Sequence, residues 1–127
     1  MKKKVHLNKL CFSRSGDKGD LSNIGLMAKT DEAYGVIKQE VTAQKVKEHF
    51  RGLCEGDVKL WPMDNLNALE IVLLKALGGG ATRTLRFDQT GKAMCGALLR
   101  MEIEADEAVI QGARDAEKEI FEKYRDW

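Results

Sequence analysis

A run of seven polar and glycine residues, from Arg14 to Asp20, separates two apolar segments near the start of the chain. The first segment, residues 5–12, alternates between apolar and polar side chains, as a half-buried strand does. The second, residues 21–28, is short, apolar and contains a glycine, and it also predicts a strand. Charged residues and glycines in such succession do not belong in a packed core. The run therefore predicts a tight turn between two strands, a ligand site, or both.

Length and charge limit the class of protein. The chain has 127 residues, the size of one domain, with 43% apolar and 32% charged residues. Its 21 basic side chains nearly balance 20 acidic ones, whereas a nucleic-acid-binding domain usually shows a basic excess. No segment approaches the roughly 20 apolar residues of a membrane span, and none follows Lys4 as a signal peptide would. With three widely spaced cysteines and no CxxC pair, we expect a cytoplasmic protein that binds neither nucleic acid nor membrane.

Apolar spacing and turn residues predict the elements between the opening strands and residue 104. Thr42 is a suitable helix N-cap, and Pro62 suits the end or edge of a strand. The segment 66–77, capped by Asp64 or Asn65, is apolar nearly all round, so we expect it to be the buried central helix. The predicted helices are 31–40, 43–54, 66–77 and 92–101, the predicted strands are 58–63 and 82–87, and glycine-containing turns are expected at 78–80 and 88–91.

The last segment, from Ala105 to Trp127, carries apolar residues at steps of three and four, a near-heptad stripe on a long helix. Acidic residues at its start, where the helix dipole favours negative charge, support this assignment. Such a stripe has to be covered, either by the rest of the domain or by another chain. We therefore expect a domain over 1–103 and an amphipathic helix over 104–127 that supports a homo-oligomer.

The polar run supplies groups for anion binding and for proton transfer. Glycines let a ligand approach the main chain, and the N–H groups of a turn can bind an anion. Arg14 and Lys18 suit a carboxylate or a phosphate, while Asp17 and Asp20 could orient a water, hold a cation or act as a base. A hairpin whose charges pair with one another remains the alternative. The run is not a Walker A motif, because Lys18 precedes Gly19 instead of following the second glycine.

Three successive glycines at 78–80, followed by Thr82 and Arg83, form a second candidate. One glycine is enough to end a helix, so three suggest that something approaches the main chain, with a mobile connection as the alternative. If the two glycine segments meet, Thr82 and Arg83 would complete a pocket with Asp17 and Lys18. The candidate catalytic residues are Asp17, Lys18 and Asp20, and the candidate ligand-binding residues are Arg14, Ser15, Gly16, Gly19, Asn23, Gly78, Gly79, Gly80, Thr82 and Arg83.

The remaining polar residues give weaker signals. Asn23 lies inside an apolar strand, where its amide needs partners, so it either supports the turn or contacts a ligand. His6 and His49 are far apart and lack metal-ligand spacing, which favours solvent-facing or structural roles. The sequence therefore predicts no metal site and identifies no cofactor, and it contains no known nucleophile–base motif.

The polar run belongs to a longer series of motifs. It continues into Asn23-Ile24-Gly25, and further motifs follow at Leu66-Asn67-Ala68-Leu69, at Ala76-Leu77-Gly78-Gly79-Gly80, and at Asp88 with Gly91-Lys92. In this order, over residues 5–101, they resemble the C-terminal domain of AtuA-like (acyclic terpene utilisation protein A) proteins. The resemblance implies a ferredoxin-like α/β (α+β) two-layer sandwich, with about four strands covered by helices, here with a C-terminal helical extension.

The resemblance implies one function, the apolar stripe of the last segment favours a second, and a third hypothesis rests on neither. In many relatives the domain follows a much larger N-terminal domain, so a chain of this length implies a small subunit that works with a separately encoded large AtuA-type chain. The family is associated with the breakdown of branched terpenoid acids and related acyl-CoA compounds, and it brings no established catalytic residues. A non-catalytic oligomerisation or regulatory module is the second hypothesis, and an independent small-molecule enzyme is the third.

Overall fold

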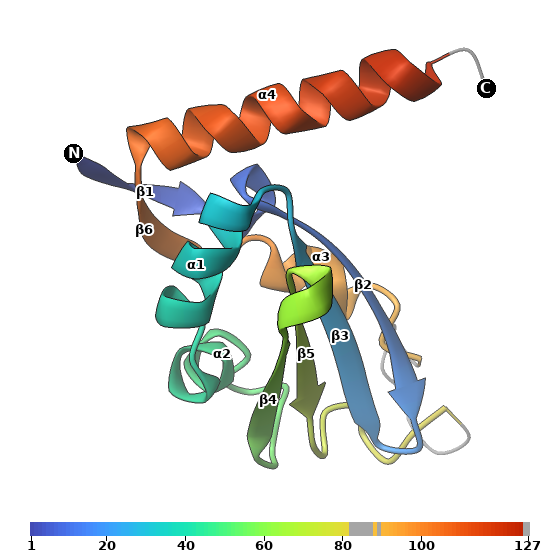
Figure 1. The fold of residues 1–127 in the computed structure, drawn as a ribbon. Helices are drawn as coiled ribbons and strands as arrows, with labels where there is room; N and C mark the ends of the chain where they lie inside the picture. Colours follow the sequence, from blue (N-terminus) through green and yellow to red (C-terminus); the bar gives the residue numbers. More distant parts are fainter. Residues whose placement is uncertain (82–87, 89, 126–127) are drawn as a thin grey trace.

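The computed structural model describes residues 1–81, 88 and 90–125, which fold into two antiparallel sheets and several helices (Figure 1). The strands are β1 (Lys2–His6), β2 (Cys11–Lys18), β3 (Leu21–Ala28), β4 (Val58–Met63), β5 (Ala68–Leu73) and β6 (Glu102–Asp106). The α-helices are α1 (Asp31–Glu40), α2 (Ala43–His49), α3 (Met94–Leu98) and α4 (Glu107–Tyr124), and the 3-10 turns are η1 (Leu7–Lys9) and η2 (Asp64–Leu66).

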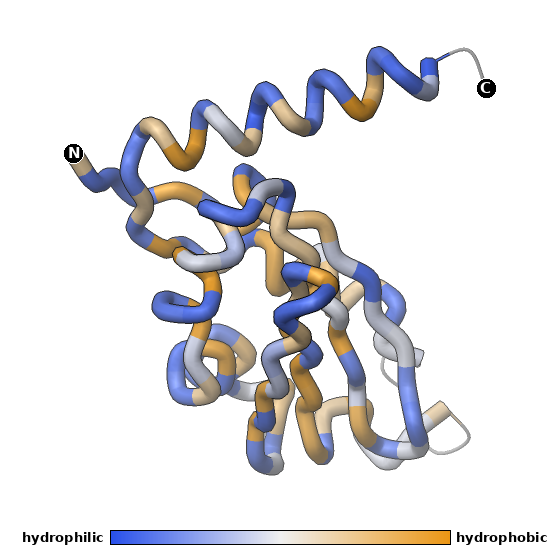
Figure 2. Tube along the Cα trace, viewed as in Figure 1, coloured by the Kyte–Doolittle hydropathy of each residue, from blue (hydrophilic) through white to orange (hydrophobic). Residues whose placement is uncertain are grey.

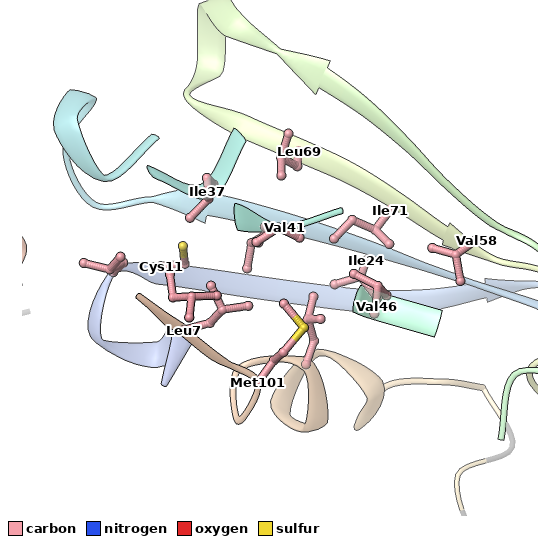
Figure 3. Close-up of a cluster of buried hydrophobic side chains, with 14 of the residues drawn as sticks. Leu7, Cys11, Ile24, Ile37, Val41, Val46, Val58, Leu69, Ile71 and Met101 are labelled. Atoms are coloured by element: carbon pink, nitrogen blue, oxygen red, sulfur yellow. The ribbon is translucent and has the colours of Figure 1, made fainter. Parts of the chain in front are cut away.

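The larger sheet has the order β2-β3-β5-β4, and β1 pairs with β6 in a separate two-stranded ladder. The short helices α1, α2 and α3 pack against one face of the larger sheet, and the core lies between them. Figure 3 shows this core, in which Ile24 of β3 and Ile71 of β5 face Ile37 of α1 and Val46 of α2. This helix-on-sheet arrangement confirms the predicted α+β sandwich of two layers.

The long helix α4 lies across the end of the domain that carries β1 and β6 (Figure 1). It is attached through its first half, where Ile110 and Ala113 are buried. Hydrophobic residues nevertheless recur along the helix as far as its distal end (Figure 2). None of the helices in the described part of the chain is long and apolar enough to cross a membrane.

The strand predicted over 5–12 is interrupted. Strand β1 ends at His6, the turn η1 follows, and β2 begins at Cys11. Leu7 and Leu10 are both fully buried, and a 3-10 turn brings residues three apart to one side, whereas a strand would alternate them. The turn is fixed by the amide of Leu7, which donates to the carbonyl of Met101 at 2.9 Å.

The central helix predicted over 66–77 is wrong, because half of this segment is β5, an interior strand between β3 and β4. Asp64 opens the turn η2 instead of capping a helix, and Asn67 leaves that turn in a left-handed conformation with φ of 51°. In β5, Leu69 and Ile71 point into the core, but apolar residues also occupy the other face. A continuous apolar run of this kind cannot be told from a buried helix by its periodicity.

Local patterns in the sequence correctly predicted several other elements. The helix over 31–40 is confirmed, as is the strand over 58–63, with Pro62 on the edge strand β4. Thr42 caps α2 as predicted, its Oγ1 accepting from the amide of Lys45 at 3.2 Å. Two predicted helices are too long: α2 ends at His49 instead of 54, and α3 spans only Met94–Leu98 of the predicted 92–101.

Two further predictions concern residues 82–87 and the C-terminal helix. The strand predicted over 82–87 lies outside the described residues. The C-terminal helix exists but begins at Glu107, because Glu104 and Ala105 belong to β6, where Ala105 pairs with Lys3. The end of the predicted stripe, Trp127, is also outside the described residues.

Candidate functional site

The polar run is mostly one arm of a β-hairpin. Strand β2 continues to Lys18, which pairs with Leu21, so the turn itself contains only Gly19 and Asp20. Gly19 has φ of 60°, the conformation that the first position of a two-residue turn of this kind requires. The predicted turn between two strands is therefore confirmed, but a loop of seven residues is not formed.

Because successive strand residues point to opposite faces, pairing divides the run between two sides of the sheet. Ser15 and Asp17 share a face with their partners Ile24 and Ser22, which is the face covered by helices. Arg14, Gly16 and Lys18 lie on the opposite face. Asp17 and Lys18, which the sequence analysis placed in one catalytic group, therefore lie on different sides of β2.

Serines on the covered face hold the segment before α3 against β2. The Ser15 hydroxyl donates to the carbonyl of Gly91 at 2.5 Å and accepts from the amide of Cys95 at 3.0 Å. The Ser22 hydroxyl donates to the carbonyl of Gly16 at 3.1 Å. Ser15 is 5% exposed and Ser22 fully buried, so these bonds are shielded from water. Ser15, predicted to bind a ligand, uses its hydroxyl to hold the main chain.

Gly91 allows this segment to approach closely. Its φ is 69°, and a Cβ there would lie 2.7 Å from Ser22 Oγ and 2.9 Å from the carbonyl oxygen of Gly16. The main chain of the next residue, Lys92, consequently lies beside the edge of the sheet. Its Nζ lies 3.2 Å from where a Cβ on Gly16 would be, and Oδ1 of Asn23 lies 3.5 Å from the same point. The ammonium group and the Asn23 amide thus occupy the space that a side chain at position 16 would fill.

The turn of the hairpin contacts the second glycine segment. The Asp20 carboxylate accepts from the amides of Leu77 at 3.1 Å and Gly79 at 2.7 Å. A Cβ on Gly80 would lie 2.8 Å from the carbonyl oxygen of Gly19, so what approaches this glycine is the chain's own turn. Gly78, Gly79 and Gly80 all have positive φ. The turn therefore lies beside the glycine segment 78–80, as the sequence predicted. Thr82 and Arg83 lie outside the described residues.

The face of the larger sheet that the short helices do not cover forms the open sheet face. Its side chains are mostly exposed or half-buried, in contrast to the covered face. The strand register arranges these residues in three rows across the sheet. The rows are Phe12, Met27, Ala68 and Met63; then Arg14, Gly25, Glu70 and Trp61; then Gly16, Asn23, Val72 and Lys59.

Two positions within these rows are glycines and carry no side chain. A Cβ on Gly25 would lie 3.6 Å from Cγ of Arg14 and 3.8 Å from Oε2 of Glu70, so these charged side chains flank bare main chain. Gly16 lies diagonally from Gly25 and is flanked by Lys92 and Asn23, as described above. Charged and amide groups therefore surround main chain that carries no side chain of its own.

The open sheet face is strongly basic. Among the described residues of this face, Glu70 is the one carboxylate on the strands, against the four cations Arg14, Lys18, Lys59 and Lys92, on a chain whose net charge is only +1. Within the described residues, none of the four cations forms an ion pair. This arrangement can bind an anion through charge-assisted hydrogen bonds.

The sequence analysis missed four residues of this face. Glu70 and Val72 were assigned to the predicted central helix, which hid their position on a strand. Trp61 and Lys92 gave no signal of their own, although Lys92 follows a glycine in one of the quoted motifs. Among the described residues, no cluster of histidine, cysteine or carboxylate side chains could hold a metal ion.

Comparison with protein families gives one match. The family described as AtuA ferredoxin-like domain matches residues 5–104, which include the whole of the larger sheet, parts of β1 and β6, and none of α4. Comparison with curated proteins and with solved structures gives no match.

Proposed function

The chain belongs to the AtuA ferredoxin-like domain family, and on this basis we propose that it is a small subunit or accessory domain of a catabolic enzyme system. The substrates that the family resemblance suggests are organic acids or acyl-CoA compounds of terpenoid type. The observation that carries the proposal is the open sheet face, which leaves one side of the larger sheet uncovered within the described structure. All three cysteines are free, which supports a reducing, cytoplasmic compartment.

We propose that a separately encoded large AtuA-type chain covers this face. Met27 is 39% exposed and Trp61 50% exposed, and large apolar side chains in this position normally pack against another layer. Aromatic residues, methionine and arginine are also the residue types enriched at the centres of protein interfaces. Arg14 lies in the same row as Trp61, so an interface here would combine an apolar contact with a basic one.

Co-expression with a large AtuA-type chain, followed by size-exclusion chromatography with light scattering, tests the proposal. We expect a stable complex that Trp61→Ala weakens by more than tenfold, the size of effect that a buried aromatic anchor shows. Phe121→Ala, on the exposed end of α4, is the matched control and should leave the complex intact. If no complex forms, or if both variants weaken it equally, the sheet face is not the subunit interface.

The predicted catalytic and ligand-binding residues remain part of this proposal. Arg14 and Asn23 lie on the open sheet face, where they would border a site shared with the large chain. Asp17 and Asp20 lie elsewhere, and Asp20 already accepts two main-chain hydrogen bonds. Asp17→Asn and Arg14→Ala, assayed in the assembled complex, test their roles: loss of turnover only in the second would restrict the site to the open face.

A second candidate function, homo-oligomerisation through α4, rests on the exposure of its distal end. Ile120 is 43% exposed and Phe121 62% exposed on a helix whose first half is already anchored. The double variant Ile120→Lys/Phe121→Lys should convert an oligomer into a monomer by light scattering. This is a sharper test than removing 105–127, because that deletion also removes the buried residues Ile110 and Ala113. An unchanged mass would rule out this interface.

A further inference from the structure

We propose that Lys92 and Arg14 bind a carboxylate or phosphate anion on the open sheet face, beside the point over Gly16 where the Lys92 ammonium lies. The proposal deepens the one above by naming the chemical class of the ligand, and it rests on the open sheet face being functional. Its new element is Lys92, which lies 76 residues from Gly16 in the sequence and reaches the sheet from the segment before α3.

The glycine provides the floor of the site. Any side chain at position 16 would meet the Lys92 ammonium at 3.2 Å and the Asn23 amide oxygen at 3.5 Å. Both polar groups therefore cover the main chain of Gly16, which is buried. The Lys92 ammonium offers three donors to the acceptor lone pairs of a carboxylate or phosphate, whereas the Asn23 atom at this point is an acceptor and supplies no donor.

Lys92 is held in place by the buried hydrogen bonds of the covered face. The Ser15 hydroxyl binds the main chain at Gly91 and Cys95, on both sides of Lys92. The close approach of Gly91 to Ser22 Oγ and to the Gly16 carbonyl leaves little freedom for this segment to move away. These contacts fix the main chain at Lys92 and so keep the root of its side chain close to Gly16, which lowers the conformational entropy lost on binding.

Arg14 supplies a second positive charge. It lies on the same face of the same strand two residues before Gly16, so their Cα atoms are about 7 Å apart. Its guanidinium forms no ion pair with a described residue and offers a planar set of donors suited to an oxyanion. Cγ of Arg14 and Oε2 of Glu70 lie 3.6 Å and 3.8 Å from where a Cβ on Gly25 would be, so the negative charge of Glu70 repels an anion from the position over Gly25. The anion is therefore centred near Gly16 instead of Gly25.

Titration of the isolated chain with sodium phosphate and, separately, with sodium propionate, at constant ionic strength, tests the proposal by amide NMR. We expect saturable shifts at Gly16, Asn23 and Gly25, and the anion that binds more tightly identifies the class. Lys92→Ala and Arg14→Ala should each weaken binding by at least tenfold, while Lys92→Arg retains it within threefold. The side chains of Arg14 and Lys92, and that of the control residue Lys59, are all exposed, so the variants should fold.

Lys59→Ala is the matched control, because Lys59 lies in the same row as Gly16 but on the opposite edge strand. It should change binding by less than twofold. If neither anion gives saturable shifts, or if Lys59→Ala weakens binding as much as Lys92→Ala, the site is only part of a diffuse basic surface and the proposal is overturned. The titration needs no partner chain, so its failure is separable from a failure of complex formation.

Discussion

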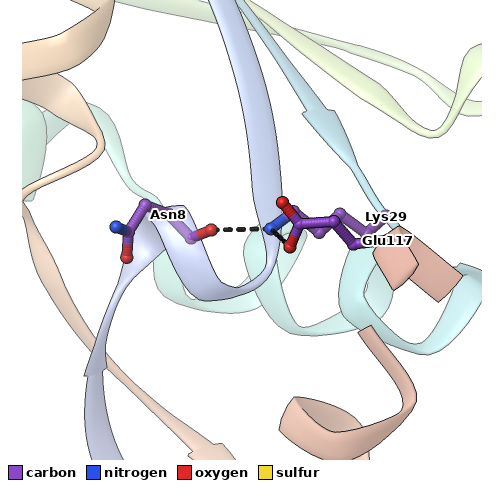
Figure 4. A network of polar contacts seen from close by, with 3 residues as sticks. All are labelled: Asn8, Lys29 and Glu117. Carbon is purple, nitrogen blue, oxygen red and sulfur yellow. Dashed lines mark hydrogen bonds and ion pairs between the residues drawn. The ribbon is translucent and has the colours of Figure 1, made fainter. Parts of the chain in front are cut away.

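A partly buried ion pair contributes to the attachment of α4 beside the buried Ile110 and Ala113, and removing its carboxylate should destabilise the whole domain. Lys29 Nζ lies 2.7 Å from Oε2 of Glu117 and donates to the carbonyl of Asn8 at 2.8 Å (Figure 4). The same ammonium lies 4.8 Å from the centre of the Phe12 ring. Its side chain is only 3% exposed, against 32% for Glu117. Glu117→Ala therefore leaves a buried cation without its counter-charge.

The size of the effect follows from this geometry. Breaking a fully buried ion pair by removing one partner costs about 3–5 kcal/mol, because the other charge is left desolvated. Water reaches part of Glu117 and could hydrate the ammonium in the variant, so we expect about 2–3 kcal/mol. For a domain of this size that corresponds to a decrease in Tm of roughly 10 °C.

Urea unfolding followed by circular dichroism measures this change as a shift of the midpoint. Glu119→Ala, which removes an exposed carboxylate from the same helix, is the control and should change the unfolding free energy by less than about 0.5 kcal/mol. The double variant Lys29→Met/Glu117→Ala should recover most of the loss, since it removes the buried charge as well. If Glu117→Ala is no more destabilising than Glu119→Ala, the ion pair does not anchor α4.

Three further predictions concern other parts of the structure. Gly91→Ala should destabilise the fold by about 2 kcal/mol or more in urea unfolding, because of its positive φ and its close contacts. The Tyr34 hydroxyl donates to Asp64 at 2.6 Å and, as the largest cause, lowers the pKa of that carboxyl. A lowered pKa stabilises the fold above the ordinary carboxyl range and this stability is lost as the pH falls, so Tyr34→Phe should unfold with a weaker dependence on pH between about 5 and 2. Burial raises the pKa of Cys11 to about 12, so iodoacetamide at neutral pH should modify Cys95 first, as mass spectrometry of the native protein would show.

Elements with local signals could be predicted from the sequence, and those defined by long-range pairing could not. The helix at 31–40 carries its own N-cap, Thr30, and an apolar face, so its prediction needed no knowledge of the rest of the chain. Strand β5 looks like a helix in the sequence because apolar residues occupy both of its faces, and only its pairing with β3 and β4 makes it a strand.

In the candidate site, too, local signals could be predicted from the sequence and long-range contacts could not. The polar run was recognisable as special from its composition, but which side chains share a face depends on the pairing of Lys18 with Leu21 across a two-residue turn. A shift of the register by one residue would move Arg14 to the covered face. The approach of Lys92 to Gly16 depends on contacts between segments far apart in the sequence, and no local pattern encodes it.

The edge strand β4 restricts how this domain can associate with other chains. A free strand edge is a template for pairing with a further strand, which leads to sheet extension and aggregation. Pro62 lacks an N–H donor and Lys59 adds a charge on the same short strand, so β4 is a poor template for such growth. The protein can therefore expose an uncovered sheet at high concentration with a reduced tendency to polymerise through its edge.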